Sequence, residues 1–153
     1  MSLELRELRM NDCQSAGEIV GQNAIWRDTY HYSAEAAARD LLYGASHGDY
    51  VLGAFDKTLI GFAWILPKGG FGRSPYLRLI AVSPNAQSRG IGAQLLDRAE
   101  ADFKKTAKHL FLMVSDFNAR AQAFYAARGY NRVGNVPGFV LATVDEQVWM
   151  KTL

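Results

Sequence analysis

A predicted strand that leads through a polar turn into a glycine-marked helix constrains the fold of this chain more than any other segment. The apolar run from Leu77 to Val82 predicts a buried strand, and the pattern Gln-x-x-Gly-x-Gly follows over residues 87–92. From Ile91 onward, apolar residues recur at helical spacing. Two glycines at the start of a helix let a ligand approach the backbone, and the N–H groups of the first turn attract an anion. The segment therefore predicts a phosphate or pyrophosphate site.

The spacing of this segment separates the classes of protein that use such a site. A P-loop requires Gly-Lys-Ser/Thr, but Ala-Gln follows Gly92. A dinucleotide-binding turn requires a strand that leads straight into Gly-x-Gly-x-x-Gly. Here seven residues separate Val82 from Gly90, and Leu95 holds the third glycine position. An ordinary strand–turn–helix unit, with glycines needed only for packing, stays open as an alternative.

Two motifs together resemble the signature of the GNAT superfamily of acetyl-CoA-dependent N-acetyltransferases. The first spans residues 80–92 and is similar to the family pattern hydrophobic-x-Val-x-Pro, followed by Gln/Arg-x-x-Gly-x-Gly/Ala. The second spans residues 118–130 and resembles the family element Asn-x-x-Ala-x-x-Phe-Tyr-x-x-x-Gly-Phe/Tyr. Two separate motifs in the right order make the resemblance specific, and it covers residues 77–130 well.

The pattern along the whole chain predicts the element order βααβββαβαββ. Strands are expected at 3–8, 50–55, 58–66, 76–82, 110–114, 130–143 (broken near 135–138) and 147–153. Helices are expected at 11–24, at 35–42 after the cap Ser33 with Gly44 beyond its end, at 90–105 and at 119–128. A two-residue turn is expected at 56–57, and a loop at 67–75. This order matches the resembled family, an α/β (α+β) fold with a mixed, largely antiparallel sheet of six or seven strands and helices on both faces.

The resemblance assigns roles around acetyl-CoA, which would be a co-substrate. The backbone of Ile80, Ala81 and Val82 would lie beside the pantetheine arm, and the Val82 N–H would point at the thioester carbonyl. Asn118 would bond the pantetheine or a water, with Ala121 and Phe124 beside it. Tyr125 would protonate the departing thiolate. The pyrophosphate would be held by the turn and first helical residues, namely Gln87, Ser88, Arg89, Gly90, Ile91, Gly92 and Ala93.

Each of these assignments has a plainer alternative. Asn118 precedes a predicted helix, so it could serve only as an N-cap. Tyr125 could belong to the apolar core, and Arg89 could lie in solvent.

One feature departs from the resembled family. Many relatives carry a Glu or Asp on the strand before the pyrophosphate turn as a general base, whereas residues 76–79 here read Tyr-Leu-Arg-Leu. Arg78 could bind an acid group of the acceptor or pair with a carboxylate of the protein itself. Trp26, Tyr30 and Arg78 are expected to contact the acceptor. Candidate bases, which spacing does not rank, are Asp28, Tyr30, His31 and Asp116.

The resemblance implies transfer of an acetyl group from acetyl-CoA to a primary amine of a small molecule or peptide, by direct attack in a ternary complex. The absent carboxylate motivates an alternative, an acyl-CoA-binding module of the same fold without turnover. A transferase that uses a larger acyl group is a third hypothesis.

Length and composition add limits to this hypothesis. A chain of 153 residues predicts one domain, 1–153. The net charge of +2 predicts neither a nucleic-acid nor a membrane partner. No apolar stretch reaches the ~20 residues of a membrane span, and the first residues lack a signal peptide, so a cytoplasmic location is expected. Cys13 is the only cysteine and has no neighbours at metal-ligand spacing, so no metal is expected. The resembled family often forms homodimers, which is a further expectation.

Overall fold

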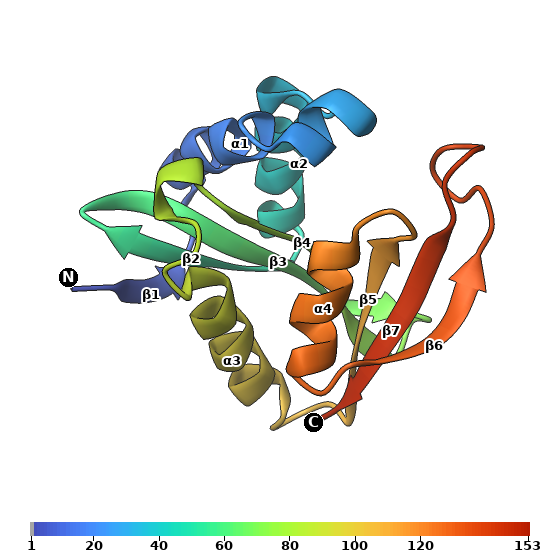
Figure 1. Cartoon of the computed structure of the whole chain (residues 1–153). Coiled ribbons are helices and arrows are strands. Elements are labelled where there is room, and N and C mark those ends of the chain that lie inside the picture. The colour runs from blue at the N-terminus through green and yellow to red at the C-terminus, as the bar shows by residue number, and fades with distance from the viewer. Residues whose placement is uncertain (1) are drawn as a thin grey trace.

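The computed structural model describes residues 2–153, which form seven strands and four α-helices (Figure 1). The strands are β1 (Glu4–Glu7), β2 (Tyr50–Asp56), β3 (Thr58–Gly70), β4 (Ser74–Val82), β5 (His109–Ser115), β6 (Asn131–Val136) and β7 (Glu146–Thr152). The α-helices are α1 (Cys13–Gly21), α2 (Ala34–Ser46), α3 (Ile91–Phe103) and α4 (Ala119–Ala127). The predicted order βααβββαβαββ is confirmed.

All seven strands belong to one sheet, in the order β1-β2-β3-β4-β5-β7-β6. Strands β4 and β5 run parallel, and the other neighbouring pairs run antiparallel. The prediction of a mixed, largely antiparallel sheet is therefore confirmed.

The two faces of the sheet carry separate apolar cores. Helices α1 and α2, which lie side by side in Figure 1, pack against Phe62, Trp64 and Leu79 on one face. Helices α3 and α4 cover the opposite face, where Leu95 and Tyr125 join Leu77 and Leu112. The α3 contact follows from its sequence, because apolar residues at helical spacing form one buried stripe. Helices on both faces were predicted and are confirmed.

A bulge in β4 explains why Leu77 and Leu79, two residues apart, pack into opposite cores. Trp64 pairs with Leu79 and Ile65 pairs with Leu77, so Arg78 is one extra residue opposite β3. Alternate residues of a regular strand share a face. The extra residue changes this, and Leu77 packs toward α3 while Leu79 packs toward α1 and α2.

The predicted loop at 67–75 is wrong. Strand β3 continues to Gly70 and β4 begins at Ser74, so the connection is only residues 71–73. Phe71 and Gly72 both have positive φ, and the Arg73 N–H donates to the Gly70 carbonyl, as in the mirror-image turns that favour hairpins. The pairing is irregular between Leu66 and Gly70, and such irregularities accommodate the missing N–H of a proline.

Three further element predictions need correction. The helix expected at 11–24 ends at Gly21, and a π-helical turn follows at Ile25–Thr29. Gly44 lies inside α2 rather than beyond its end. Asp49 and Trp64 leave no room for a side chain at this position, which accounts for a glycine within the helix. The strand expected at 130–143 ends at Val136, and residues 137–145 form no further strand.

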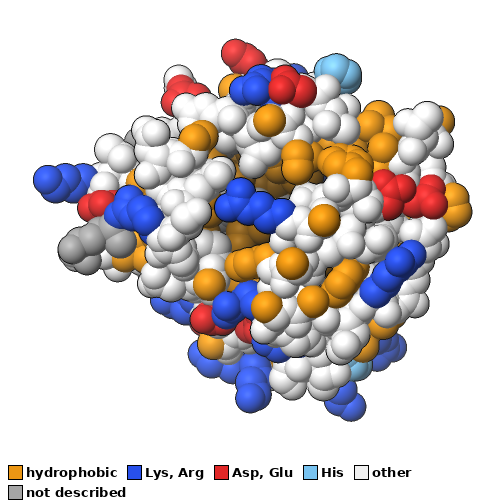
Figure 2. All heavy atoms as spheres, viewed as in Figure 1, with side chains coloured by type: hydrophobic (Ala, Val, Ile, Leu, Met, Phe, Trp, Pro, Cys, Tyr) orange, Lys and Arg blue, Asp and Glu red, His pale blue; other side chains and the backbone are white. Residues whose placement is uncertain are grey.

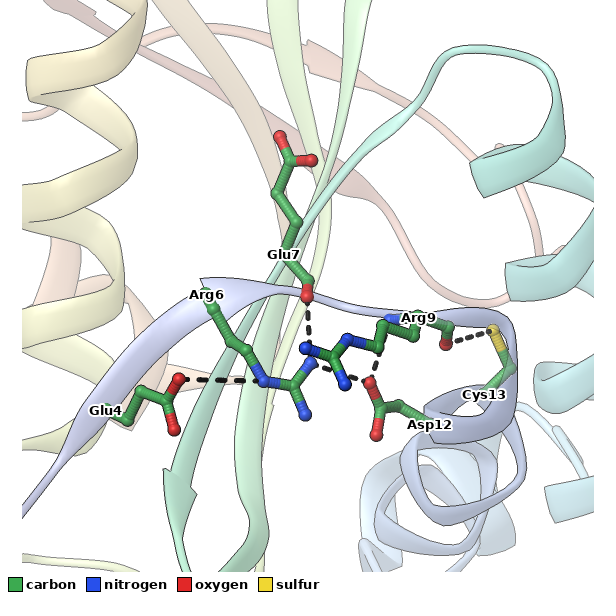
Figure 3. Close-up of polar contacts among 6 residues, drawn as sticks. All are labelled: Glu4, Arg6, Glu7, Arg9, Asp12 and Cys13. Carbon is green, nitrogen blue, oxygen red and sulfur yellow. Dashed lines mark hydrogen bonds and ion pairs between the residues drawn. The ribbon is translucent and has the colours of Figure 1, made fainter.

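The N-terminal strand is tied to α1 by a polar network (Figure 3). Arg6 donates to the Asp12 carboxylate at 2.8 Å, and the same carboxylate accepts the Arg9 backbone N–H at 2.8 Å. The Asp12 side chain therefore stabilises the turn before α1 and makes no capping bond to that helix. Cys13 is buried beneath this network, and burial raises the pKa of its thiol.

Among residues 2–153, none of the helices has the length and apolar composition that crossing a bilayer requires. The same residues contain no group of three or more His, Cys, Asp or Glu side chains placed to hold a metal ion.

Candidate active site

A cavity of about 790 Å³ lies between β4, β5, α3, α4 and the segment that follows α1. Figure 2 shows a hollow with apolar side chains on its walls and basic side chains near its rim. The cavity exists because β4 and β5 pair only at Tyr76↔Phe111 and Leu77↔Leu112. Beyond Leu77 the two strands separate, and the gap between them opens into the cavity.

The separated edge of β4 supplies unpaired backbone to this cavity. Ile80, Ala81 and Val82 all line it, and on their other edge they pair with β3. A strand with one free edge binds an extended ligand by adding it as a further strand. The Gln87 side chain donates to the Val82 carbonyl at 3.3 Å, which fixes the turn that leads away from β4.

The start of α3 presents unpaired backbone N–H groups, the kind of group that an anion accepts. Gly90 is the N-cap residue with φ 76°, a left-handed conformation that glycine adopts without strain. The first backbone bond of the helix is from the Gln94 N–H to the Gly90 carbonyl, so the N–H groups of residues 91–93 precede it. A Cβ on Gly92 would lie 3.7 Å from Phe124 and 4.0 Å from Ile80, so Gly92 faces the cavity.

Most of the predicted binding residues line this cavity. They are Ile80, Ala81, Val82, Gln87, Ser88, Gly90, Ile91, Gly92, Ala93, Asn118, Ala121 and Phe124. Arg89 is not among the lining residues, and its guanidinium pairs with Asp56 at 3.4 Å. Arg120, at the start of α4, lines the cavity although the sequence motif did not single it out.

Asn118 has the capping role that was one of its two predicted roles. Its side-chain oxygen accepts the Ala121 N–H at 3.1 Å at the start of α4. Because Asn118 also lines the cavity, capping and ligand contact are compatible.

Tyr125 projects from α4 into the cavity wall. Its side chain is 7% exposed and lies between the rings of Phe124 and Tyr130, with centroids at 5.2 and 5.6 Å. Burial, and secondarily the neighbouring Tyr76, raises the pKa of Tyr125 well above its usual value. The hydroxyl therefore stays protonated at neutral pH.

A buried carboxylate, Glu146, faces the same cavity and was missed by sequence reasoning. Glu146 is 6% exposed at the start of β7, where it pairs with Ser115 of β5. The Tyr30 hydroxyl donates to Glu146 and bonds Ser115, and the Ser115 hydroxyl lies 3.4 Å from both carboxylate oxygens. Burial and the bond to Glu146 raise the pKa of Tyr30 to about 12. All three side chains line the cavity.

The other candidate bases have different surroundings. Asp28 is exposed and pairs with Arg27 at 2.8 Å. His31 is also exposed, and Asp116 accepts the Asp145 N–H at 3.2 Å just before β7. Of the four candidates, Tyr30 alone lines the cavity, where it hydrogen-bonds Glu146.

Arg78 lines the cavity, and its guanidinium already contacts other side chains of the protein. Its guanidinium stacks over Trp64 at 4.1 Å from the ring centroid and pairs with Asp40 at 3.9 Å. Asp40 also accepts the Tyr32 hydroxyl at 2.7 Å. Trp26 and Tyr30, the other predicted acceptor contacts, line the cavity and lie ring to ring at 5.5 Å.

Solved structures with the same fold span nearly the whole chain. The PaiA N-acetyltransferase of Thermoplasma acidophilum, determined in complex with coenzyme A, has a TM-score of 0.77 at 24% identity and covers 100% of both chains. An acetyltransferase from Thermus thermophilus has a TM-score of 0.81 at 19% identity, over 100% of this chain and 98% of that one. The ribosomal-protein-S18-alanine N-acetyltransferase of Escherichia coli has a TM-score of 0.78 at 19% identity, over 99% and 94%.

These similarities establish the fold, and the sequence adds an independent match. The profile of the acetyltransferase (GNAT) family matches residues 17–130, which includes α3, α4 and every strand from β2 to β5. The cavity described above lies mostly within this matched segment. The chain therefore belongs to the GNAT acetyltransferase family.

Proposed function

We propose that this protein transfers an acetyl group from acetyl-CoA to a primary amine. One observation carries the proposal: a single cavity brings together the free edge of β4, the start of α3, the Tyr125 hydroxyl and the Glu146 carboxylate. These are two binding elements for an extended phosphorylated thioester and two groups able to move protons. The coenzyme A bound to the Thermoplasma acidophilum relative supports the same donor here.

The residues present fit this donor. The N–H groups of residues 91–93, with the positive end of the α3 dipole behind them, suit a pyrophosphate. Arg120 adds a positive charge at the start of α4. The free edge of β4 suits an amide-containing arm, because its backbone offers hydrogen bonds that β5 does not take.

The proton-transfer groups fit amide formation. An alkyl amine is mostly protonated at neutral pH and must lose a proton before its nitrogen attacks the thioester carbon. Glu146 accepts that proton, since a carboxylate has several acceptor sites and Tyr30 and Ser115 leave some of them available. The Val82 N–H stabilises the oxyanion. As the C–S bond breaks, Tyr125 donates its proton to the sulfur. The nitrogen releases its second proton, which restores the Tyr125 hydroxyl, and Glu146 passes the first proton to solvent, so that the products are an amide and a free thiol.

Glu146 could also replace the carboxylate that β4 lacks. The absent group was the reason to consider a binding module without turnover, and Glu146 supplies a buried carboxylate from β7 instead. Transfer is therefore favoured over binding alone.

The test is Glu146→Gln, assayed by thiol release from acetyl-CoA with a panel of primary amines. We expect kcat/KM for the amine to fall by about 10²–10⁴-fold at neutral pH, the usual size of general-base assistance. The loss should shrink as rising pH delivers more neutral amine, and acetyl-CoA affinity should be unchanged. The control is Glu35→Gln, an exposed glutamate of α2. Full activity of Glu146→Gln at neutral pH would contradict the role, and binding of acetyl-CoA without transfer to any amine would favour the binding module.

A further inference from the structure

A second, smaller cavity adjoins the first one, and its chemistry is different. It has a volume of about 200 Å³ and lies between the β3–β4 turn, β5, β7 and the segment after β6. Its walls include Phe71, Phe111, Phe139 and Val148, and none of its lining residues is charged. We refer to it as the side cavity.

The side cavity borders the end of the active site that holds Glu146. Tyr76, Met113 and Phe139 line both cavities. Tyr76 lies close enough to Glu146 to be influenced by it, because the carboxylate adds to the effect of burial in raising the pKa of Tyr76. A ligand that reaches Glu146 with its amine therefore has the side cavity within reach.

The size of the side cavity suits a single ring or a short branched alkyl group. An apolar cavity of about 150 Å³ in another protein binds benzene, so about 200 Å³ is sufficient. Apolar rings gather at its mouth, where Phe71 is 83% and Phe139 is 58% exposed. Phe71 packs edge-on against Phe111 at 5.4 Å between ring centroids. Exposed apolar side chains grouped around a cavity are typical of a binding groove.

The charges near the two cavities favour an acceptor that carries an amine and has no acid group of its own close to that amine. Glu146 offers a negative charge to an ammonium group. Of the two arginines within residues 2–153 that line the large cavity, Arg120 lies at the start of α4 near the proposed pyrophosphate site, and Arg78 already contacts Asp40 and Trp64.

We propose that the acceptor is a primary amine with an apolar arm of about one ring, whose amine meets Glu146 while the arm fills the side cavity. This inference rests on the proposed acetyl transfer and narrows the acceptor class for the same site. Burial of the arm would lower KM by removing apolar surface from water.

The first test compares 2-phenylethylamine with ethanolamine, which share a two-carbon spacer and a primary amine. We expect kcat/KM to be at least about tenfold higher for 2-phenylethylamine, because an added apolar group in a fitting pocket gains that much or more. Equal values for the two amines would overturn the inference while leaving acetyl transfer intact. If neither amine is acetylated and acetyl-CoA does not bind, the proposed function itself has failed.

The second test fills the side cavity. Val148→Phe should reduce the preference for 2-phenylethylamine over ethanolamine by about tenfold, because the new ring occupies the place of the arm. The control is Val133→Phe, the same change at an exposed β6 position outside both cavities, which should keep the preference within about twofold. If Val148→Phe does not fold, Phe139→Ser at an exposed wall position should lower the preference in the same direction. An unchanged preference in a folded wall variant would overturn the inference.

Discussion

At the scale of single residues, the cavity brings together Tyr125, which lies in a recognisable sequence motif, and Glu146, which lies in none. Tyr125 belongs to a local motif on α4, and the resemblance of that motif to the family element predicted its place at the site. Glu146 reaches the site only through the register of β7 against β5, where it lies opposite Ser115. No local pattern around residue 146 encodes that register, because antiparallel pairing is a tertiary property.

The role of Tyr125 is tested by Tyr125→Phe, which removes the hydroxyl and keeps the ring between Phe124 and Tyr130. We expect kcat to fall by about 10²–10⁴-fold, the usual contribution of a proton donor, with little change in acetyl-CoA affinity. Measurement requires conditions in which chemistry limits turnover. Tyr43→Phe, at an exposed position outside the cavity, is the control. If kcat is unchanged, Tyr125 is only a packing residue.

At the scale of elements, the prediction succeeded where the chain signals its own local structure. The Gln-x-x-Gly-x-Gly pattern marks the start of α3, and Asn118 marks the start of α4. The prediction failed where contacts with residues distant in sequence determine the local structure. Gly44 was expected beyond a helix because glycine often ends helices, but α2 continues through it to pack close to Asp49 and Trp64. Residues 67–70 were expected in a loop, but they continue β3 into a tight hairpin.

The anion site at the start of α3 is tested by Gly92→Glu. The new side chain would enter the cavity near Phe124 and place a negative charge among the N–H groups of the first turn. We expect acetyl-CoA affinity to fall by at least about tenfold, since the site loses both space and favourable charge. Calorimetric titration measures this directly. The control is Gln94→Glu, which adds the same charge to an exposed position of α3 that does not line the cavity. Equal affinity for folded Gly92→Glu and the parent protein would show that the pyrophosphate lies elsewhere.

At the scale of the whole molecule, Tyr30 links parts of the chain that are far apart in sequence. It follows the π-helical turn after α1, yet its hydroxyl bonds Ser115 on β5 and Glu146 on β7. The link joins the segment after α1 to the two strands β5 and β7. The sequence suggested Tyr30 as an acceptor contact, whereas its bonds to β5 and β7 depend on how the two halves of the sheet meet.

Because of this link, the free energy of unfolding is expected to fall as the pH rises through the alkaline range. The pKa of Tyr30 is about 12 in the folded protein, against about 10 in the unfolded chain. Its contribution to the free energy of unfolding is therefore fully present below about pH 10 and is lost as pH rises from about 10 to 12. We expect Tyr30→Phe to show a shallower decline of stability over this interval, measured by urea unfolding at a series of pH values. The other buried tyrosines titrate in both proteins and cancel in the comparison. Equal slopes would mean that the hydroxyl is not held as described.

The separation of β4 from β5 has a consequence for how such a site tolerates mutation. The hydrogen-bonding groups on the free edge of β4 are main chain, and every residue except proline supplies the same N–H and C=O groups. Exchanges at Ile80 or Val82 that preserve extended backbone would therefore change the apolar wall of the cavity and leave these hydrogen-bonding groups in place. Tyr125 and Glu146 are different, because their proposed roles depend on the side chain itself. Exchanging either residue would remove its proton-transfer group. Hydrogen bonding to the donor thus depends mainly on the backbone path of β4, whereas proton transfer depends on the identity of a few side chains.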